Sequence, residues 1–345
     1  MRKGILQSLL FFGLAGMLSL QSCNRDPIEI DNNSVIKFPY SLYAATQDGT
    51  VINTNNGEDF QFVFPPDGFG PTQLLTSGNN LIMIKDNLHT SVNEGKSFNP
   101  TFTKVRKFPW QTMVYDFPAQ NSVFVTSHEG KGIFSSRDNG ITWKEETFEE
   151  NAPQLMEIGS FSGLDDGRVF AYSNMSNLLF AKDNADAIWK PVTMVTFLPT
   201  SGSSYYLTSG GNTLYLTDYY GQGGVWMSTD FGYSWTRLER GSMQVGYTYT
   251  STVAPYGNKI VIVSTLEGGI FRSGEDGVFK EAMSGLATGT KVYRLSKKLN
   301  VYKNDLVKTY IYAATNNGIY RSEDVGQTWV QVGKGKWDGD YLSVY

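Results

Sequence analysis

Two carboxylic acids, Asp116 and Glu157, are the residues whose type and position best suit catalysis in this sequence. Each falls in a short run that predicts a β-strand, and the two strands are expected to be neighbours that face a common channel. A pair of carboxyl groups about 5 to 10 Å apart can hydrolyse a glycosidic bond, one as acid and the other as base or nucleophile. The alternative interpretation of both residues is a solvated or ion-paired channel lining.

A second group of polar and aromatic residues suits binding rather than catalysis. Its members fall in predicted loops, where aromatic rings can stack on sugar rings and a few polar groups fix the orientation of a ligand. The group consists of Trp110, His128, Glu129, Tyr219, Tyr220, Arg240, Glu267 and Trp337. Tyr219 and Tyr220 lie in a polar, glycine-rich stretch and are expected to be the most exposed, although each aromatic ring could instead pack between structural units.

Several other kinds of chemistry do not fit the residues present. His89 and His128 are the only histidines and Cys23 is the only cysteine, so no zinc site of the usual ligands is expected. No glycine-rich phosphate loop precedes a predicted helix, and no cofactor is expected, while calcium bound by loop carboxylates stays compatible with the sequence. The net charge is −4 and the densest basic cluster, at 104–107, holds three charges, so no nucleic-acid partner is expected.

The N-terminus is typical of an exported lipoprotein. Residues 1–22 combine a basic start with a short apolar run, which predicts a signal peptide and not a membrane-spanning helix. The run ends in a Leu-Gln-Ser-Cys sequence that resembles the bacterial lipobox, so Cys23 is expected to carry a lipid that supplies the only membrane contact. An ordinary signal peptide that ends near a cysteine is the alternative.

Residues 23–34 then form a polar tether, and their acidic character resembles the surface-export signals of Bacteroidota lipoproteins. These considerations predict an outer-membrane anchor, on the periplasmic or the exposed side of the membrane. The acidic residues are Asp26, Glu29 and Asp31.

The strongest pattern in the chain is a recurring eight-residue motif. Three copies fit Ser-x-Asp-x-Gly-x-(Thr/Ser)-Trp, and they lie at 136–143, 228–235 and 322–329. Weaker copies lie at 53–60, 91–98, 181–189 and 273–279. The acidic or amide positions, which include Asp183 and Glu275 in the last two, are 38 to 49 residues apart. That period is typical of a propeller blade of four short strands.

The motif resembles the Asp-box, or BNR repeat, of sialidase-like and related propellers. Its Asp is expected to accept hydrogen bonds from the amides of a tight turn, its Gly to supply a positive φ, and its Trp to pack between sheets. The residues expected in these structural roles are Asp138, Gly140, Trp143, Asp230, Gly232, Trp235, Asp324, Gly326 and Trp329. The resemblance also implies that the boxes lie on hairpins far from any active site.

The repeats predict an all-β fold, a single seven-bladed β-propeller of four-stranded blades over residues 35–345. In the third blade the strands are expected, from inner to outer, at 112–117, 122–127, 132–136 and 142–147. The first blade has its second and third strands at 41–46 and 50–53 but lacks an inner strand. Residues 341–345 are expected to supply that strand and to leave no open edge, with 35–38 as the alternative.

Three functions are compatible with such a chain. We expect a non-catalytic cell-envelope lipoprotein that binds a glycan or an envelope protein. A glycoside hydrolase is the alternative, although the Phe-Arg-Ile-Pro motif of sialidases is missing and the related glucanases place their site between two propellers. The third is an assembly or scaffold factor, because the chain resembles the single-propeller lipoproteins that help to build photosystem II, without their arginine-rich patch.

Overall fold

The computed structural model describes three short strands near the start of the domain and most of the chain from residue 73 onward. The described residues are 42–45, 51–54, 61–64, 73–105, 113–127, 132–152, 158–174, 176–194, 205–219, 223–245, 247, 249–255, 259–267, 269–301, 307–333 and 341–344. The predicted signal peptide, Cys23, the tether and the alternative strand at 35–38 therefore lie outside the described residues.

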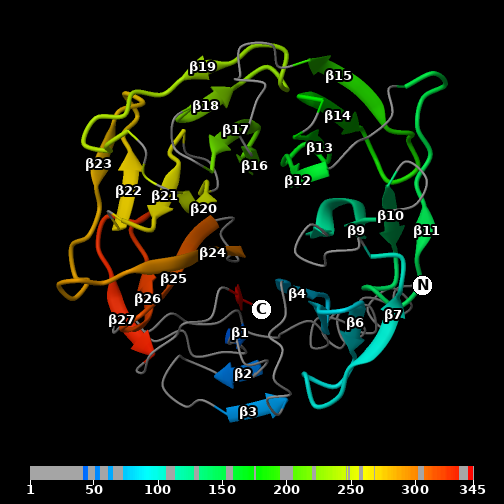
Figure 1. Cartoon of the computed structure of the whole chain (residues 1–345), viewed down its shortest axis with the longest axis horizontal. Helices are drawn as coiled ribbons and strands as arrows, with labels where there is room; N and C mark the ends of the chain where they lie inside the picture. Colours follow the sequence, from blue (N-terminus) through cyan, green and yellow to red (C-terminus); the bar gives the residue numbers. More distant parts are fainter. Residues whose placement is uncertain are drawn as a thin grey trace, which may run out of the picture.

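The described strands form seven four-stranded antiparallel sheets that are arranged as a ring around a central axis (Figure 1). The prediction of an all-β propeller built from four-stranded antiparallel blades is confirmed. The described residues contain no α-helix, and their only helical turn is η2 (Pro118–Gln120). Within this part of the chain, no helix is long and apolar enough to cross a membrane.

Consecutive strands build every sheet except the first, and we number the blades 1 to 7 along the chain. Blade 1 contains β28 (Tyr341–Val344), β1 (Leu42–Ala45), β2 (Val51–Thr54) and β3 (Gln61–Phe64). Blade 2 contains β4 (Gln73–Ser77), β5 (Asn80–Ile84), β6 (Leu88–Ser91) and β7 (Asn99–Phe102). Blade 3 contains β8 (Val114–Phe117), β9 (Ser122–Thr126), β10 (Ile133–Ser136) and β11 (Lys144–Glu145). Blade 4 contains β12 (Ile158–Gly163), β13 (Val169–Ser173), β14 (Leu178–Lys182) and β15 (Lys190–Met194).

The remaining blades follow the same order from the central axis outward. Blade 5 contains β16 (Tyr205–Gly210), β17 (Thr213–Asp218), β18 (Val225–Ser228) and β19 (Thr236–Arg237). Blade 6 contains β20 (Tyr249–Val253), β21 (Ile262–Thr265), β22 (Gly269–Ser273) and β23 (Phe279–Glu281). Blade 7 contains β24 (Val292–Val301), β25 (Val307–Thr315), β26 (Gly318–Ser322) and β27 (Val330–Gly333).

The ring is closed by the last strand of the chain. β28 pairs antiparallel with β1, with Tyr43 opposite Ser343, and it takes the innermost place in blade 1 (Figure 1). This pairing confirms the closure that the sequence predicts. Because β28 covers the inner edge of β1, no unpaired edge of that strand faces the axis.

The strands of blade 3 agree with the predicted ones except at the outer edge. The fourth strand was expected at 142–147, but β11 covers only two residues. Thr142 is held by the preceding turn instead, because its backbone N–H donates to Oδ1 of Asp138 at 2.8 Å and its hydroxyl donates to Oδ2 at 2.6 Å. These bonds keep Thr142 out of the ladder, so the strand starts two residues later.

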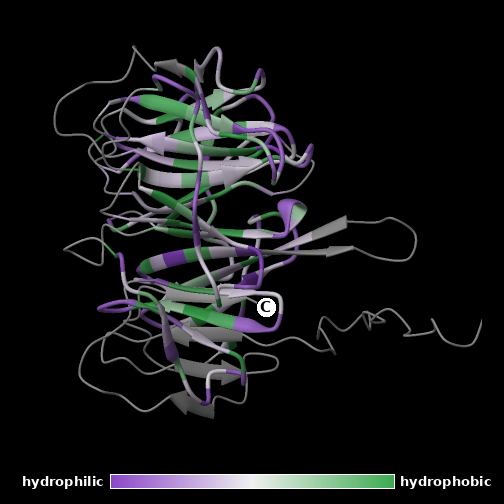
Figure 2. Cartoon of the chain, turned by 90° about the vertical axis from the view of Figure 1, so that its right-hand side faces the viewer, coloured by the Kyte–Doolittle hydropathy of each residue, from purple (hydrophilic) through white to green (hydrophobic). Residues whose placement is uncertain are grey.

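The hydrophobic core lies between neighbouring blades and not within one of them. Figure 2 shows hydrophobic residues concentrated along the strands and hydrophilic ones in the connecting loops. Between blades 3 and 4, Phe124 and Phe161 have ring centroids 6.1 Å apart, and Trp189 packs edge-on against Phe124 at 5.7 Å. All three side chains are buried. Burial of this apolar area stabilises each pair of blades, because neither sheet can cover its own face alone.

The Asp-box builds the hairpin between the third and fourth strands of a blade. In blade 3, the Ser136 hydroxyl donates to Asp138 at 2.7 Å and accepts from the N–H of Gly140 at 2.9 Å. Asn139 and Gly140 have φ values of 56° and 86°, and such angles favour glycine and asparagine. Asp230 and Asp324 accept equivalent bonds in blades 5 and 7. The expected turn geometry is therefore present at all three complete boxes.

The box glycines also bring each turn against the preceding blade. A Cβ added to Gly140 would lie 2.5 Å from Cδ1 of Ile82 in blade 2. The corresponding contact of Gly232 is Leu179 of blade 4 at 2.2 Å, and Gly326 has a similar contact in blade 6. Only glycine fits such a close approach, so the boxes couple neighbouring blades as well as shape their own hairpins.

The weaker boxes differ in how they satisfy the turn. Asn93 substitutes directly for Asp, since its Oδ1 accepts from the N–H of Ser97 at 2.9 Å. Asp183 was expected to be the acceptor of the next turn, but Asn184 takes this role. Its Oδ1 accepts from the backbone N–H groups of Asp186 and Ala187, at 3.0 Å each. In blade 6, Glu275 was expected to be the acceptor, but Asp276 accepts the hydrogen bond from the backbone instead. The inserted and deleted residues shift the acceptor by one position in both turns.

Candidate functional site

A pocket of about 190 Å³ lies where the inner strands begin, around the central axis of the ring. Six inner strands contribute residues to it, namely β4, β8, β12, β16, β20 and β24. Its lining residues are Gln73, Met113, Val114, Tyr115, Ser160, Phe161, Tyr206, Leu207, Thr208, Tyr249, Thr250, Ser251, Thr252 and Arg294. Hydroxyl-bearing side chains predominate among the polar ones, and Arg294 is the only charged residue of this lining.

Neighbouring strands fix the position of Arg294. On one side of it, the Thr250 hydroxyl of β20 donates to the carbonyl of Val292 at 3.1 Å. On the other side, the Ser251 hydroxyl donates to the carbonyl of Leu295 at 3.3 Å. β20 therefore lies beside the strand that carries Arg294, and it brings the hydroxyl of Thr252 into the same pocket.

Four polar groups of this pocket have no hydrogen-bond or ion-pair partner among the described residues, one of them the buried hydroxyl of Tyr249 and the other three less buried. These three are the Arg294 guanidinium and the hydroxyls of Thr208 and Thr252. Other polar groups of the lining are occupied, since the side chain of Gln73 bonds both backbone groups of Val114, at 2.7 and 3.1 Å. The unoccupied donors are thus available to a ligand.

An aromatic pair extends the pocket. Tyr206 lines it with 36% of its surface exposed, and its ring meets that of Tyr219 edge-on at a centroid distance of 6.0 Å. Tyr219 is one of the predicted binding residues, and its carbonyl accepts from the N–H of Tyr249, whose side chain lines the pocket. The structure therefore brings Tyr219 next to the central pocket.

The charge of Lys297 lies further along the same inner strand as Arg294. Its Nζ donates to the carbonyls of Ser209 and Ala254 at 2.8 and 2.9 Å, so it joins blades 5, 6 and 7. Loss of hydration on burial lowers the pKa of Lys297 to about 8, and the charge of Asp165 opposes this shift. The ammonium is thus a structural contact between blades and adds positive charge along this inner strand.

Asp116 does not line the central pocket. Its side chain lines a hollow of about 150 Å³ between blades 2 and 3, together with Ser77 and Asn139. Burial raises the pKa of Asp116 to about 6, and a hydrogen bond with Ser77 opposes the shift. Glu157, its expected catalytic partner, lies outside the described residues, so the pair stays a prediction.

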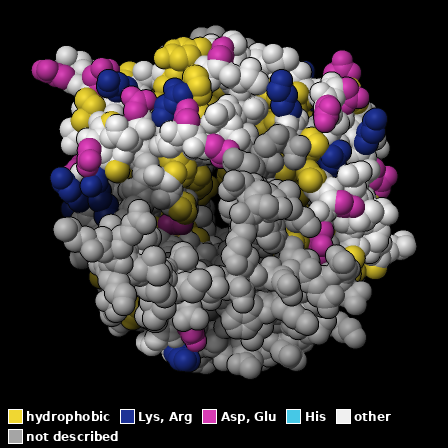
Figure 3. Space-filling view, turned by 180° about the vertical axis from the view of Figure 1, so that it is seen from behind, with side chains coloured by type: hydrophobic (Ala, Val, Ile, Leu, Met, Phe, Trp, Pro, Cys, Tyr) yellow, Lys and Arg dark blue, Asp and Glu magenta, His cyan; other side chains and the backbone are white. Residues whose placement is uncertain are grey.

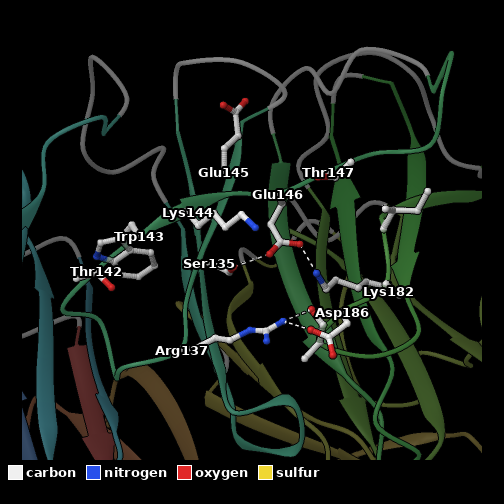
Figure 4. A pocket seen from close by; sticks show the side chains of 13 residues that line it. Ser135, Arg137, Thr142, Trp143, Lys144, Glu145, Glu146, Thr147, Lys182 and Asp186 are labelled. Carbon is white, nitrogen blue, oxygen red and sulfur yellow. Dashed lines mark hydrogen bonds and ion pairs between the residues drawn. The ribbon is translucent and has the colours of Figure 1, made fainter.

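A hollow of about 420 Å³ lies at the outer rim between blades 3 and 4 (Figure 4). Glu146 and Lys182 meet in its interior, and Arg137 spans its lower edge to Asp186 (Figure 4). Glu146 also accepts from the Ser135 hydroxyl at 2.5 Å. These four charges are paired within the protein, whereas the side chains of Lys144 and Glu145, which also line this rim pocket, have no hydrogen-bond or ion-pair partner among the described residues.

The other predicted binding residues are distributed around the ring. Arg240 lies near Asp218 and Tyr249, since its charge opposes the raised pKa that burial gives Tyr249. Glu267 lies in the exposed turn between β21 and β22. Trp110, His128, Glu129, Tyr220 and Trp337 lie outside the described residues.

Four central residues were not predicted from the sequence: Tyr206, Thr208, Thr252 and Arg294. Each belongs to an inner strand, where the alternation of side chains does not reveal which face lies toward the axis. Arg294 shares its strand with Lys297 and Lys298, so its charge alone does not single it out in the sequence.

No metal centre is found among the described residues, and the described part of one face of the ring carries charges of both signs. Within those ranges, no group of three or more His, Cys, Asp or Glu side chains is placed to hold a metal ion. On the described part of the face in Figure 3, acidic and basic side chains are interspersed. On this described part of the face, that pattern gives no continuous basic path for a nucleic acid.

Fold and pocket together define a β-propeller protein with a ligand-sized pocket on its axis. No family model and no curated protein matches the sequence. The similar solved structures compared below are distant in sequence, and they establish the fold alone.

Three of these structures illustrate the kinds of protein that share the fold. Virginiamycin B lyase from Staphylococcus aureus with quinupristin is 11% identical, with a TM-score of 0.55 over 80% of this chain and 96% of that one. The extracellular domain of a putative hybrid two-component system from B. thetaiotaomicron is 11% identical, with a TM-score of 0.54 over 84% of this chain and 39% of that one. YCF48 bound to D1 peptide is 12% identical, with a TM-score of 0.51 over 79% of this chain and 85% of that one.

Proposed function

We propose that this chain is an Asp-box propeller lipoprotein of the cell envelope that binds a glycan at its central pocket without hydrolysing it. The observation that carries the proposal is the set of unoccupied donors in that pocket, on Thr208, Thr252 and Arg294, beside the half-exposed ring of Tyr206. Sugar sites combine an aromatic face with a few polar groups that fix orientation. The same combination is present here.

Binding is favoured over hydrolysis because the described lining of the central pocket holds no carboxyl group. Glycoside hydrolysis needs two carboxyl groups about 5 to 10 Å apart across the scissile bond. Asp116, the described candidate, lies in a separate hollow beside Ser77. An anchor at Cys23, on the outer membrane and facing either side, completes the proposal and rests on the lipobox-like sequence alone.

The test is a glycan-binding screen on the chain from residue 23 onward, followed by calorimetry and an assay for released sugar. Tyr206→Ala is expected to weaken binding about tenfold or more, because a stacked aromatic ring is lost. Tyr233→Ala is the matched control, since Tyr233 is 69% exposed at the turn of the blade 5 box. Equal loss in both variants would argue against the central pocket.

Turnover of any glycan that is abolished by Asp116→Asn would replace the binding function with an enzymatic one. Binding to proteins or peptides, with no response to any glycan, would favour the assembly or scaffold role. YCF48, which shares the fold, was solved bound to a peptide, so a peptide library belongs in the same screen.

A further inference from the structure

We propose that the sugar bound at the central pocket is anionic, and that its carboxylate or sulfate group pairs with Arg294. The inference rests on the proposed glycan-binding function and adds the chemical class of the ligand. It starts from Arg294 being the only charged residue among the described lining residues.

A guanidinium that lines an open pocket without a protein partner is available to pair with an anionic ligand. In the part of the chain that the structure describes, no hydrogen bond, ion pair or ring contact engages Arg294. Arginine presents a planar fork of N–H donors that matches the two oxygens of a carboxylate or the oxygens of a sulfate. A neutral sugar offers no group of matching charge and geometry.

The surrounding groups complete an oxyanion site. β20 lies beside Arg294 through the hydrogen bonds of Thr250 and Ser251, and it places Thr252 in the same pocket. Among the described residues, neither the hydroxyl of Thr252 nor that of Thr208 from β16 has a hydrogen-bond partner. An oxyanion held by Arg294 could accept further bonds from these hydroxyls, because hydroxyl groups rotate to suit a partner.

Charge in the neighbourhood favours an anion as well. The described lining contains no Asp or Glu to compete for the guanidinium. Lys297, further along β24, is held by two carbonyls and is acted on by the charge of Asp165, so Arg294 alone supplies positive charge to the described lining.

The size of the pocket limits what enters. A volume of about 190 Å³ admits the anionic end of a glycan and not several sugar rings. The rest of a chain would leave over Tyr206 and Tyr219, whose rings lie edge to face at 6.0 Å. The geometry therefore favours recognition of an anionic terminal residue.

The test compares three oligosaccharides of the same length and linkage, one neutral, one ending in a uronic acid and one ending in a sulfated sugar. Calorimetry on the chain from residue 23 onward is expected to show at least about tenfold tighter binding of one anionic form than of the neutral form. The preferred form distinguishes carboxylate from sulfate. The preference should fall as NaCl is raised, because salt screens the attraction.

Arg294→Gln is expected to reduce the affinity for the anionic glycan to that for the neutral one. Arg294→Lys keeps the charge without the fork, so it should retain part of the preference, and it serves if Arg294→Gln does not fold. Arg137→Gln is the control, since it removes a guanidinium at the rim while leaving the central pocket unchanged.

Equal affinity for neutral and anionic glycans, unaffected by Arg294→Gln, would overturn the inference and leave the proposed function in place. A preference that is lost in Arg137→Gln and kept in Arg294→Gln would move the site to the rim pocket and also overturn it. Failure of every glycan to bind, with or without binding of carboxylate-ended peptides, would reject the proposed function itself.

Discussion

Lys182 of blade 4 and Glu146 of blade 3 form an ion pair across the blade boundary with both side chains almost completely buried, at 4% and 9% exposure. Glu146 also accepts from the Ser135 hydroxyl and from the indole N–H of Trp189, the latter at 3.0 Å. The carboxylate is therefore fully satisfied in its buried position, and its ammonium partner is what balances its charge.

Lys182→Met should lower the free energy of unfolding by about 3 to 5 kcal/mol, because it leaves the Glu146 carboxylate buried without a counter-charge. Urea denaturation measures the change. The matched control is Arg137→Gln, which breaks the exposed pair with Asp186 in the same pocket and should cost about 0 to 1 kcal/mol. A loss below about 1 kcal/mol in Lys182→Met would show that the buried pair is not needed for stability.

Gly140→Ala should destabilise the protein through two effects, a positive φ of 86° and a clash with Ile82. Gly167→Ala isolates the first effect, because Gly167 has a φ of 94° and nothing within 4 Å of an added Cβ, and should cost about 1 kcal/mol. The excess cost at Gly140 should shrink when Ile82→Val removes the atom 2.5 Å away. A double-mutant cycle measures this coupling, and additive effects would contradict the proposed contact between blades.

Asp116→Asn should change how stability depends on pH. The pKa of Asp116 is raised to about 6 in the folded chain, above its unfolded value, so the folded state binds the extra proton. The contribution of Asp116 is therefore favourable below pH 4 and is lost as pH rises through 6. The variant should be more stable than the original at pH 8, by about 2 kcal/mol, and the advantage should disappear toward pH 4. Parallel denaturation curves at both pH values, with a constant difference, would contradict this assignment.

Two box tryptophans allow a matched test of one hydrogen bond. The indole N–H of Trp329 donates to the carbonyl of Ala282 in blade 6 at 2.9 Å, whereas the buried indole nitrogen of Trp143 has no partner among the described residues. Trp329→Phe should cost about 1 to 3 kcal/mol more than Trp143→Phe, because it leaves a buried carbonyl unsatisfied. Thermal unfolding of both variants measures the difference, and equal midpoints would contradict it.

The sequence predicts the hairpins well because Ser, Asp and Gly at fixed spacing can satisfy a turn by themselves, as at Ser136, Asp138 and Gly140. It does not predict which residue accepts when the spacing changes. Asn184 replaces Asp183 because an inserted residue moves the turn, and the pattern of residue types does not record that shift. The hydrogen bonds of the turn can therefore be predicted from the sequence only where the motif is complete.

The central pocket could not be predicted in the same way. Tyr206, Thr208, Thr252 and Arg294 are separated by up to about 90 positions in the sequence, and they meet only because inner strands from different blades surround one axis. Alternation along a strand shows that two faces differ, but a slip of one residue exchanges those faces. The tertiary arrangement decides which side chains meet, and the sequence of one blade contains no information about it.

The pairing of Tyr43 with Ser343 has a consequence for how the chain is made. During synthesis the first strands leave the ribosome about 300 residues before the strand that they pair with. Blades 2 to 7 consist of consecutive strands and can form in order as they emerge, since their pairings are local. Blade 1 is therefore begun before blades 2 to 7 and completed after them, and until β28 has been synthesised the inner edge of β1 stays open to chaperones or to a neighbouring chain.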